Sequence, residues 1–227
     1  MLSAPYFGIT AEVTREHVID SGQKLDFSRT IHLDIKRPNR LHAEMESEHA
    51  QRGYWYDGKL LTVLDRKRNL FSSTSLSGTL DDALDNARDQ FGIDLPLIDL
   101  AISDPFKNAM ANVKSGAYYG VSPVMGYHCH HLAFSQDNVD WQVWIEDGPQ
   151  PLIRKFVITH KLEEGQPTFT ALITQWTSAS GLRIRILCSR RHEGRSRSRC
   201  ERNKLRLRKG EQRRGVRTLQ RLRGLKR

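Results

Sequence analysis

The chain has little of what would cross-link a fold or carry it through a membrane. It has three Cys among 227 residues. Cys188 and Cys200 lie near the C-terminus, so Cys129 is alone in the rest of the chain and cannot form an internal disulfide there. No stretch approaches the roughly 20 apolar residues of a membrane span. The residues after Met1 lack the basic and apolar regions of a signal peptide. We therefore predict a domain held by its core, with no membrane span.

Positive charge is concentrated at one end. The formal net charge is +10, but residues 178–227 hold 19 Lys and Arg against 3 Asp and Glu, a balance of +16. The remaining 177 residues hold 17 basic and 23 acidic residues, a balance of −6. The basic character therefore belongs to the tail alone. The sequence predicts two parts, a domain over residues 1–177 and an Arg-rich tail over residues 178–227.

The tail contains no Asp, Pro, Phe, Tyr or Trp. Such a segment buries too little apolar surface to offset its ordering entropy, so disorder is expected. Three interpretations stay open. The tail contacts nucleic-acid phosphates without sequence preference, although base stacking is unavailable without aromatic residues; or it has no partner; or it is an out-of-frame product of a GC-rich gene. Its abrupt change in composition favours the third.

Two-residue alternation of apolar and polar side chains dominates residues 1–177, and this is the period of a half-buried strand. Phe7 to Val13 begin the pattern, and a turn at Asp20–Gln23 leads to the next run, Leu25 to Ile35. About nine such runs reach Trp176, with Asp57-Gly58 as one tight hairpin turn. No βαβ alternation is present. The fold class is therefore mainly β (α+β), an antiparallel or barrel-like sheet.

A helical insert interrupts the strands at about residues 79–101. Thr79 is a good N-cap, and apolar residues follow at helical spacing until Gly92, where a helix stops. Asp94-Leu95-Pro96 predicts the start of a shorter helix over residues 97–101, which ends at Asp104-Pro105.

The run His128-Cys129-His130-His131 is the main metal candidate. On a strand, His128 and His130 share one face while Cys129 and His131 share the other. Two ligands per face are incomplete for zinc, which needs three or four. We therefore predict no metal site, although a metal-dependent enzyme at His128–His131 stays open as an alternative.

No other motif indicates catalysis. The chain has no phosphate-binding loop, dinucleotide fingerprint or nucleophile elbow. Cys129 cannot hydrogen-bond to its strand neighbours His128 and His130, which point to the opposite face. It does share a face with His131, yet a buried structural Cys is the commoner outcome. We predict no catalytic residue, no cofactor and no enzyme.

The Trp residues are the candidate ligand-binding residues. Trp141 and Trp144 fall on opposite faces of one predicted strand, so both faces of the sheet are covered or engaged. One is expected in the core, and the other could line an apolar groove, because ligand sites are rich in aromatic side chains. Trp55 is the third candidate ligand-binding residue.

Six short motifs, in a fixed order along residues 6–176, resemble those of a known family. They are Asp20–Leu25, Arg37–Leu41, Tyr56–Lys59, Cys129–Phe134, Val139–Glu146 and Pro151–Lys155. The family is a bacterial family of predicted periplasmic proteins of unknown function. The resemblance implies a lipoprotein-carrier (LolA/LolB-like) half-barrel, which is a curved antiparallel sheet or incomplete β-barrel with helices on its concave side. It also implies export to the periplasm, and it carries over no catalytic residue.

Two features depart from the family's pattern. Its members begin with a signal sequence and a helix, and they end in further strands rich in Phe and Pro. Here Met1 leads directly into the first strand, and the Arg-rich tail follows Trp176. We interpret the chain as shortened at its front and frame-shifted at its end.

Three hypotheses of function result. The first, which we predict, is a non-enzymatic periplasmic binding or carrier protein for a lipid, an acyl chain or a lipidated partner, because a half-barrel offers an apolar concavity. The second is a nucleic-acid-associated protein that acts through the tail. The third is the metal-dependent enzyme.

Overall fold

One sheet contains every strand among the described residues. The computed structural model describes residues 4–76, 78–93 and 97–178, all within the unit Met1–Leu182. The predictions for the tail from Ala179 onward lie outside the described residues. The elements are β1 (Tyr6–Val18), β2 (Lys24–Lys36), β3 (Arg40–Ser47), β4 (Gln51–Tyr56), β5 (Leu60–Asp65), β6 (Leu70–Ser75), α1 (Leu80–Phe91), η1 (Ile98–Leu100), α2 (Pro105–Met110), β7 (Ser115–Val124), β8 (Tyr127–Ser135), β9 (Val139–Glu146), β10 (Ile153–His160) and β11 (Thr168–Ser178).

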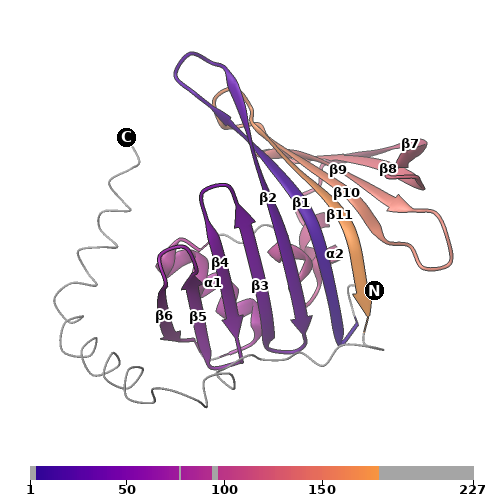
Figure 1. Ribbon diagram of the computed structural model, residues 1–227. Helices are drawn as coiled ribbons and strands as arrows, with labels where there is room; N and C mark the ends of the chain where they lie inside the picture. The colour runs from indigo at the N-terminus through magenta and orange to yellow at the C-terminus, as the bar shows by residue number, and fades with distance from the viewer. Residues whose placement is uncertain (1–3, 77, 94–96, 179–227) are drawn as a thin grey trace, which may run out of the picture. The chain divides into compact units, whose positions relative to one another are not determined.

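The eleven strands pair in the order β6-β5-β4-β3-β2-β1-β11-β10-β9-β8-β7, and every pair is antiparallel. The sheet thus consists of two meanders, β1–β6 and β7–β11, which meet where β1 pairs with β11 (Figure 1). Its edges, β6 and β7, are connected through the helical segment. The sheet is curved and open, so the predicted incomplete barrel is confirmed.

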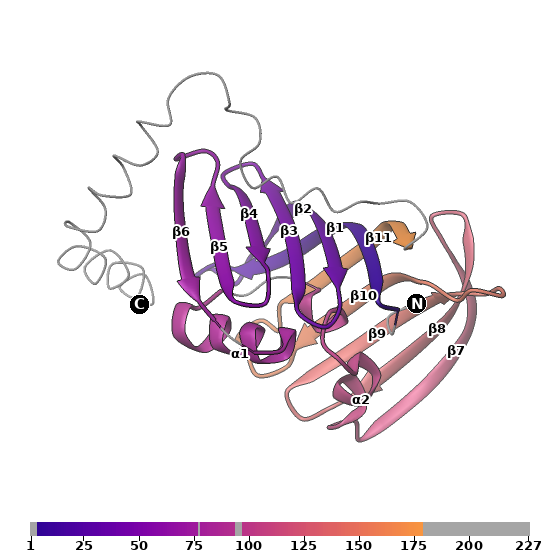
Figure 2. The same ribbon diagram turned by 90° about the horizontal axis from the view of Figure 1, so that it is seen from below.

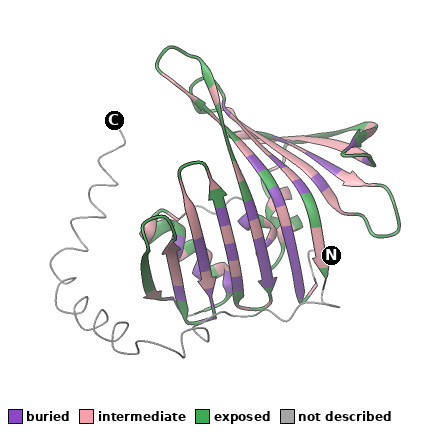
Figure 3. Ribbon diagram, viewed as in Figure 1, coloured by how far each residue is buried: buried purple, intermediate pink, exposed green. Residues whose placement is uncertain are grey.

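Side-chain alternation decides which face of each central strand is buried. The apolar residues of β1 at Phe7, Ile9, Ala11 and Val13 are at most 1% exposed. The residues opposite them on β2 and β11 are largely apolar as well, so one face of the sheet forms the core. Figure 3 shows this alternation as bands of buried residues along the central strands.

The helices lie on the concave side of the sheet (Figure 2). The helix α1 begins with a capping box, in which Thr79 and Asp82 each accept a hydrogen bond from the other's backbone N–H. It ends at Gly92, which takes the left-handed conformation with φ +63°. Leu80 and two Ala residues are buried against the sheet. The predicted first helix is confirmed.

Three local predictions are wrong. The count of about nine strands is too low, and the strand without a counterpart in the sequence pattern is β6, which is Ser-rich and has no apolar alternation. The short helix predicted at 97–101 is a single 3-10 turn, η1, and its expected start at 94–96 lies outside the described residues. Asp104 and Pro105 were predicted to end the helical insert. They instead begin another helix, α2, in which Asp104 is the N-cap and Pro105 is the first residue.

Candidate functional site

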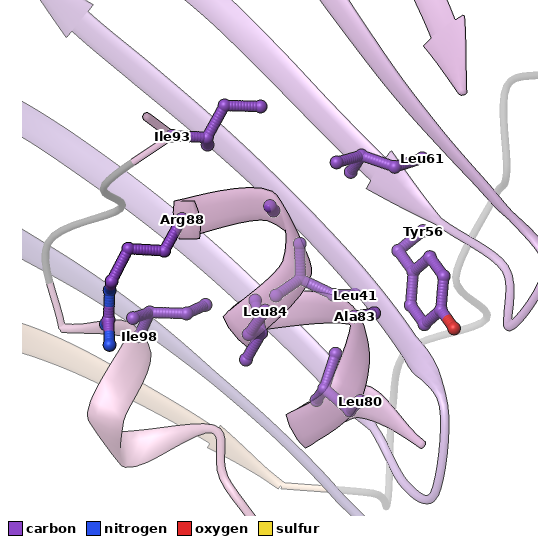
Figure 4. A pocket seen from close by; sticks show the side chains of 10 residues that line it. Leu41, Tyr56, Leu61, Leu80, Ala83, Leu84, Arg88, Ile93 and Ile98 are labelled. Atoms are coloured by element: carbon purple, nitrogen blue, oxygen red, sulfur yellow. The ribbon is translucent and has the colours of Figure 1, made fainter. Parts of the chain in front are cut away.

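A small apolar cavity lies between α1 and the concave face of β3–β5 (Figure 4). Its volume is ≈ 20 Å³, about room for one water molecule. The helix α1 therefore fills the space that a ligand would need. Of the lining side chains, only Arg88 is charged. The lining consists of Leu41, Tyr56, Leu61, Leu80, Ala83, Leu84, Ala87, Arg88, Ile93 and Ile98.

A row of apolar side chains extends across the concave face of the other half of the sheet. Each member lies opposite the next on neighbouring strands, so the side chains share one face. Exposure is highest at the edge of the sheet, where Tyr118 is 58% exposed, and Ala171 at the other end is fully buried. The row therefore connects the β7 edge with the core. Its members are Tyr118, Leu132, Val143, Phe156 and Ala171.

Trp141 lies beside this row on the same concave face. Its ring stacks on Phe134 with 4.1 Å between centroids and 22° between planes, and its centroid is 5.8 Å from that of Phe156. Phe134 and Phe156 are half-buried, and Phe156 packs against the main core. The concave face of β8–β10 is thus aromatic and uncharged at its centre.

The other two candidate Trp residues lie on the convex face. The ring of Trp144 stacks on His131 at 4.1 Å and 10°, and its indole N–H donates to Ser122 Oγ at 3.0 Å. Trp55 stacks on His42 at 5.3 Å and 18°. The three Trp residues therefore do not converge on one site. Only Trp141 lies on the apolar concave face, and its role in binding stays a prediction.

A buried polar network crosses the convex face of β1–β4. Asp34, which is 6% exposed, accepts a hydrogen bond from the Tyr6 hydroxyl at 3.0 Å. Its Oδ2 atom is 3.2 Å from Nε2 of His32 and 3.5 Å from Nδ1 of His42. His42 also hydrogen-bonds Glu44 through Nε2 at 3.1 Å. One carboxylate thus holds three partners, one from each of β1, β2 and β3.

The network extends to Arg66, directly after β5, and depends on two Gly residues. Arg66 donates to Glu44 at 2.6 Å and 3.2 Å. A Cβ atom on Gly8 would lie 2.6 Å from Oδ1 of Asp34, and one on Gly53 would lie 2.2 Å from the ring of Trp55. Glycine at these positions leaves room for the network. This network was not predicted from the sequence, although its His and acidic members occupy the polar positions of two adjacent alternating runs.

The network shifts the pKa values of its members. Burial alone would lower the pKa of His42, but hydrogen bonds with Asp34 and Glu44 and their negative charges raise it from 6.5 to about 9. The hydrogen bond with Asp34 also raises the pKa of His32. Burial opposes ionisation of Asp34, yet the two His partners hold its pKa well below the usual value. The network therefore favours an ionised Asp34 beside a protonated His42.

We expect the free energy of unfolding to fall between pH 6 and pH 9. A His with a raised folded-state pKa stabilises the fold fully below its unfolded pKa, and this contribution is lost as the pH rises through the folded value. For His42, with a folded pKa of about 9, the loss is on the order of 2–3 kcal/mol. Urea unfolding at both pH values measures it. The variant His42→Gln should lose much less, and an equal loss in both proteins would contradict the assignment.

The His cluster of β8 is divided between the two faces of the sheet. His130 lies on the concave side, where Nδ1 is 2.9 Å from the Tyr118 hydroxyl and Nε2 is 3.4 Å from Asp147, whereas His131 lies on the convex side. Cys129 is fully buried, and burial raises the pKa of its thiol, so it lacks the character of a nucleophile. In the part of the chain that the structure describes, no three His, Cys, Asp or Glu residues could hold a metal ion.

A larger hollow of ≈ 470 Å³ lies on the polar side of β1–β3 and β11. Its lining is dominated by carboxylates and hydroxyls, which suit water or a polar molecule better than an acyl chain. The concave face is therefore the better candidate for an apolar ligand. The polar lining residues of the hollow are Glu12, Thr14, Ser28, Arg29, Thr30, Glu46, Ser47, Glu48 and Thr170.

Comparison with protein families gives a match over most of the chain. A family model described as "Predicted periplasmic protein (DUF2092)" matches residues 1–184. The chain belongs to this family. This agrees with the resemblance that the six sequence motifs indicated, which was to a family of predicted periplasmic proteins of unknown function. A comparison with curated proteins finds no significant match. None of the helices in the described ranges of this DUF2092 protein has the length and apolar character needed to cross a membrane.

The DUF2092 chain is also similar to several solved structures. The lipoprotein LppX of Mycobacterium tuberculosis is 11% identical, with 77% of this chain and 88% of that chain covered and a TM-score of 0.45. LprF of Mycobacterium bovis is 11% identical, with 77% of this chain and 87% of LprF covered and a TM-score of 0.48. A putative outer membrane lipoprotein-sorting protein domain of Vibrio parahaemolyticus is 7% identical, with 79% of this chain and 87% of that domain covered and a TM-score of 0.34.

Proposed function

We propose that this DUF2092 protein is a non-enzymatic periplasmic binding or carrier protein that holds a lipid, an acyl chain or a lipidated partner against the concave face of its sheet. The observation that carries the proposal is the extent of apolar surface on that face, from the cavity under α1 to the row between Tyr118 and Ala171. Binding sites for apolar ligands are concave and largely uncharged. Each methylene group that leaves water contributes about 0.8 kcal/mol.

Binding under α1 requires this helix to move away from the sheet. The cavity of ≈ 20 Å³ is far smaller than the roughly 300–1,000 Å³ of ligand sites. The buried residues of α1 are Leu80, Ala83 and Ala87, and two of these are small. Leu84 and Phe91 of α1 also pack against this core, so a ligand would replace one apolar contact by another, and the surface left behind is apolar.

The polar groups of the domain support binding rather than catalysis. The two residues whose pKa values are shifted most, Asp34 and His42, lie on the convex face and bond to each other. They do not face the apolar surface on which a ligand would lie. The centre of the concave face, at Phe134, Trp141 and Phe156, therefore supplies area and shape and brings no acid–base pair to a bound molecule.

The variant Phe134→Asp is expected to weaken uptake of a fluorescent fatty-acid probe by about tenfold or more. Phe134 is half-buried on the concave face, so a carboxylate there would lose hydration when an acyl chain covers it. Trp141→Ala should weaken uptake in the same direction, because it removes a large aromatic surface. Titration of the probe, with circular dichroism to confirm the fold, measures both variants.

Trp55→Ala is the matched control, because Trp55 lies on the convex face. It should leave probe affinity within about twofold, since the change alters no concave surface. Native mass spectrometry of the purified protein should also detect co-purified lipid. A clean apo mass together with no uptake of the probe would refute the proposed function.

A further inference from the structure

Exposed apolar side chains gather on the hairpin formed by β7 and β8. Of the eleven large apolar side chains exposed among the described residues, five belong to this hairpin. They lie along the edge strand and at the turn, where Met125 has φ +49°. The five are Tyr118, Tyr119, Val121, Met125 and Tyr127.

The hairpin also lacks formal charge. Residues 115–135 contain no Asp, Glu, Lys or Arg, whereas edge strands are commonly protected by charged residues, Lys above all. Charged residues that lie beside the hairpin are engaged, and Lys114, directly before β7, is paired with Asp137. Asp147 lies 3.4 Å from His130, and the buried Arg154 lies under the ring of Tyr127 and is ion-paired at 2.6 Å. A neutral, partly aromatic surface is thus presented at one edge of the sheet.

We propose that the turn and outer edge of the β7–β8 hairpin enter the headgroup region of a lipid bilayer and admit an acyl chain to the concave face. The inference rests on the proposed function. Tyr suits this position because its ring is apolar and its hydroxyl stays hydrated at the membrane interface. The absence of charge matches a zwitterionic lipid surface, because no ion has to be desolvated on entry.

The position of the patch relative to the core supports this role. Tyr118, the exposed end of the concave row, is followed by residues that are half-buried or buried, and the row ends at Ala171, which is fully buried. An acyl chain that left a bilayer at this edge would therefore meet apolar side chains along its whole path, without passing a charged group in the row. The free-energy cost of exposing the acyl chain to water would be avoided.

A protein strand fits the same edge less well. The pairing of β7 with β8 is irregular between Tyr118 and Val121, and Gly120 there has φ +88°. Pro123, further along β7, has no N–H to donate. A bulge and a proline interrupt the backbone ladder that an added strand would need. A second copy or another protein is therefore the less favoured occupant, and the experiment below separates it from lipid.

Sedimentation with vesicles of phosphatidylcholine tests the proposal. Zwitterionic vesicles are used because the basic residues of 178–227 would bind anionic lipid by charge alone. The full chain should sediment with these vesicles, and added salt should change binding little. The variant Val121→Asp/Met125→Asn should lower the partition coefficient by about tenfold or more. Asn tolerates the left-handed conformation of residue 125, so the turn is kept.

The matched control is Phe106→Asp/Leu162→Asn, which makes the same types of change at positions that are 76% and 79% exposed and lie outside the hairpin. It should bind vesicles like the unaltered chain. Equal loss in both variants would overturn the inference, and so would a loss of binding in high salt. A lipid-free dimer that only the hairpin variant abolishes would assign the surface to a second copy.

Uptake of a short, water-soluble fatty acid separates this inference from the proposed function. The hairpin variant should still take up this probe within about twofold of the unaltered chain, because its concave centre is unchanged. If the unaltered chain takes up the probe but never sediments with vesicles, the hairpin inference fails and the carrier function stands. If it does neither, both fail.

Discussion

Asp34→Ala is expected to lower the free energy of unfolding by about 3–5 kcal/mol, the cost typical of removing one partner from a buried ionic cluster. The carboxylate is 6% exposed and contacts Tyr6, His32 and His42. Without it, a buried hydroxyl loses its acceptor and His42 loses one of two negative partners. Urea unfolding near pH 6 measures the loss, which would be a large part of the roughly 5–15 kcal/mol of a typical domain.

Asp140→Ala serves as the control for this prediction. Asp140 also accepts hydrogen bonds, from Ser135 and Lys161, but its side chain is half exposed. Exposed ion pairs contribute about 0–1 kcal/mol, so this variant should cost little. A similar cost for both variants would mean that burial of Asp34 adds nothing. The pH dependence of Asp34→Ala should also be weaker, because the pKa of His42 would fall toward its ordinary value.

Arg154→Met is expected to cost about 3–5 kcal/mol as well, for the same kind of reason on the other half of the sheet. The guanidinium is 6% exposed and donates to Glu146 Oε2 at 2.8 Å and 2.6 Å. It also lies 3.7 Å from the centroid of the Tyr127 ring. Its position follows from the irregular pairing of β9 and β10 between Ile153 and Lys155, since a bulge redirects a side chain. The variant leaves a half-buried carboxylate without its cation.

A double-mutant cycle isolates this ion pair. Arg154→Met/Glu146→Gln should be less destabilised than the sum of the two single variants, with a coupling of about 1–3 kcal/mol. Arg68→Met is the control, because the Arg68 side chain is 72% exposed where it meets Asp65. It should change stability by about 0.5 kcal/mol or less. Additive effects at residues 146 and 154 would exclude a direct interaction.

Local signals in the sequence account for most of the fold. The alternation from Phe7 to Val13 predicted β1 and its buried face, and Thr79 and Gly92 marked both ends of α1. These features depend on neighbours within one turn or along one strand, so they can be read from a single segment. The strand β6 could not be read in this way, because its polar side chains lie at the edge of the sheet and need no apolar face.

The candidate site was predicted less completely, because it depends on which strands become neighbours. Alternation placed Trp141 and Trp144 on opposite faces, as the structure shows. It did not assign either one to the concave face, since that requires the pairing order of the whole sheet. The same holds for Asp34 and His42, which meet only because β2 and β3 pair in a specific register. The lipid ligand stays a proposal.

The first and last strands of the domain, β1 and β11, are partners in the middle of the sheet. The two meanders are therefore joined by one pair of hydrogen-bonded strands, and the sheet forms as a whole only when segments more than 150 residues apart meet, as with Phe7 and Ser178. Losing β11 would not merely shorten an edge. It would divide the sheet into two separate smaller sheets, each with a newly exposed edge strand. The apolar row that leads from the β7–β8 hairpin to the core would then be interrupted between Phe156 and Val13.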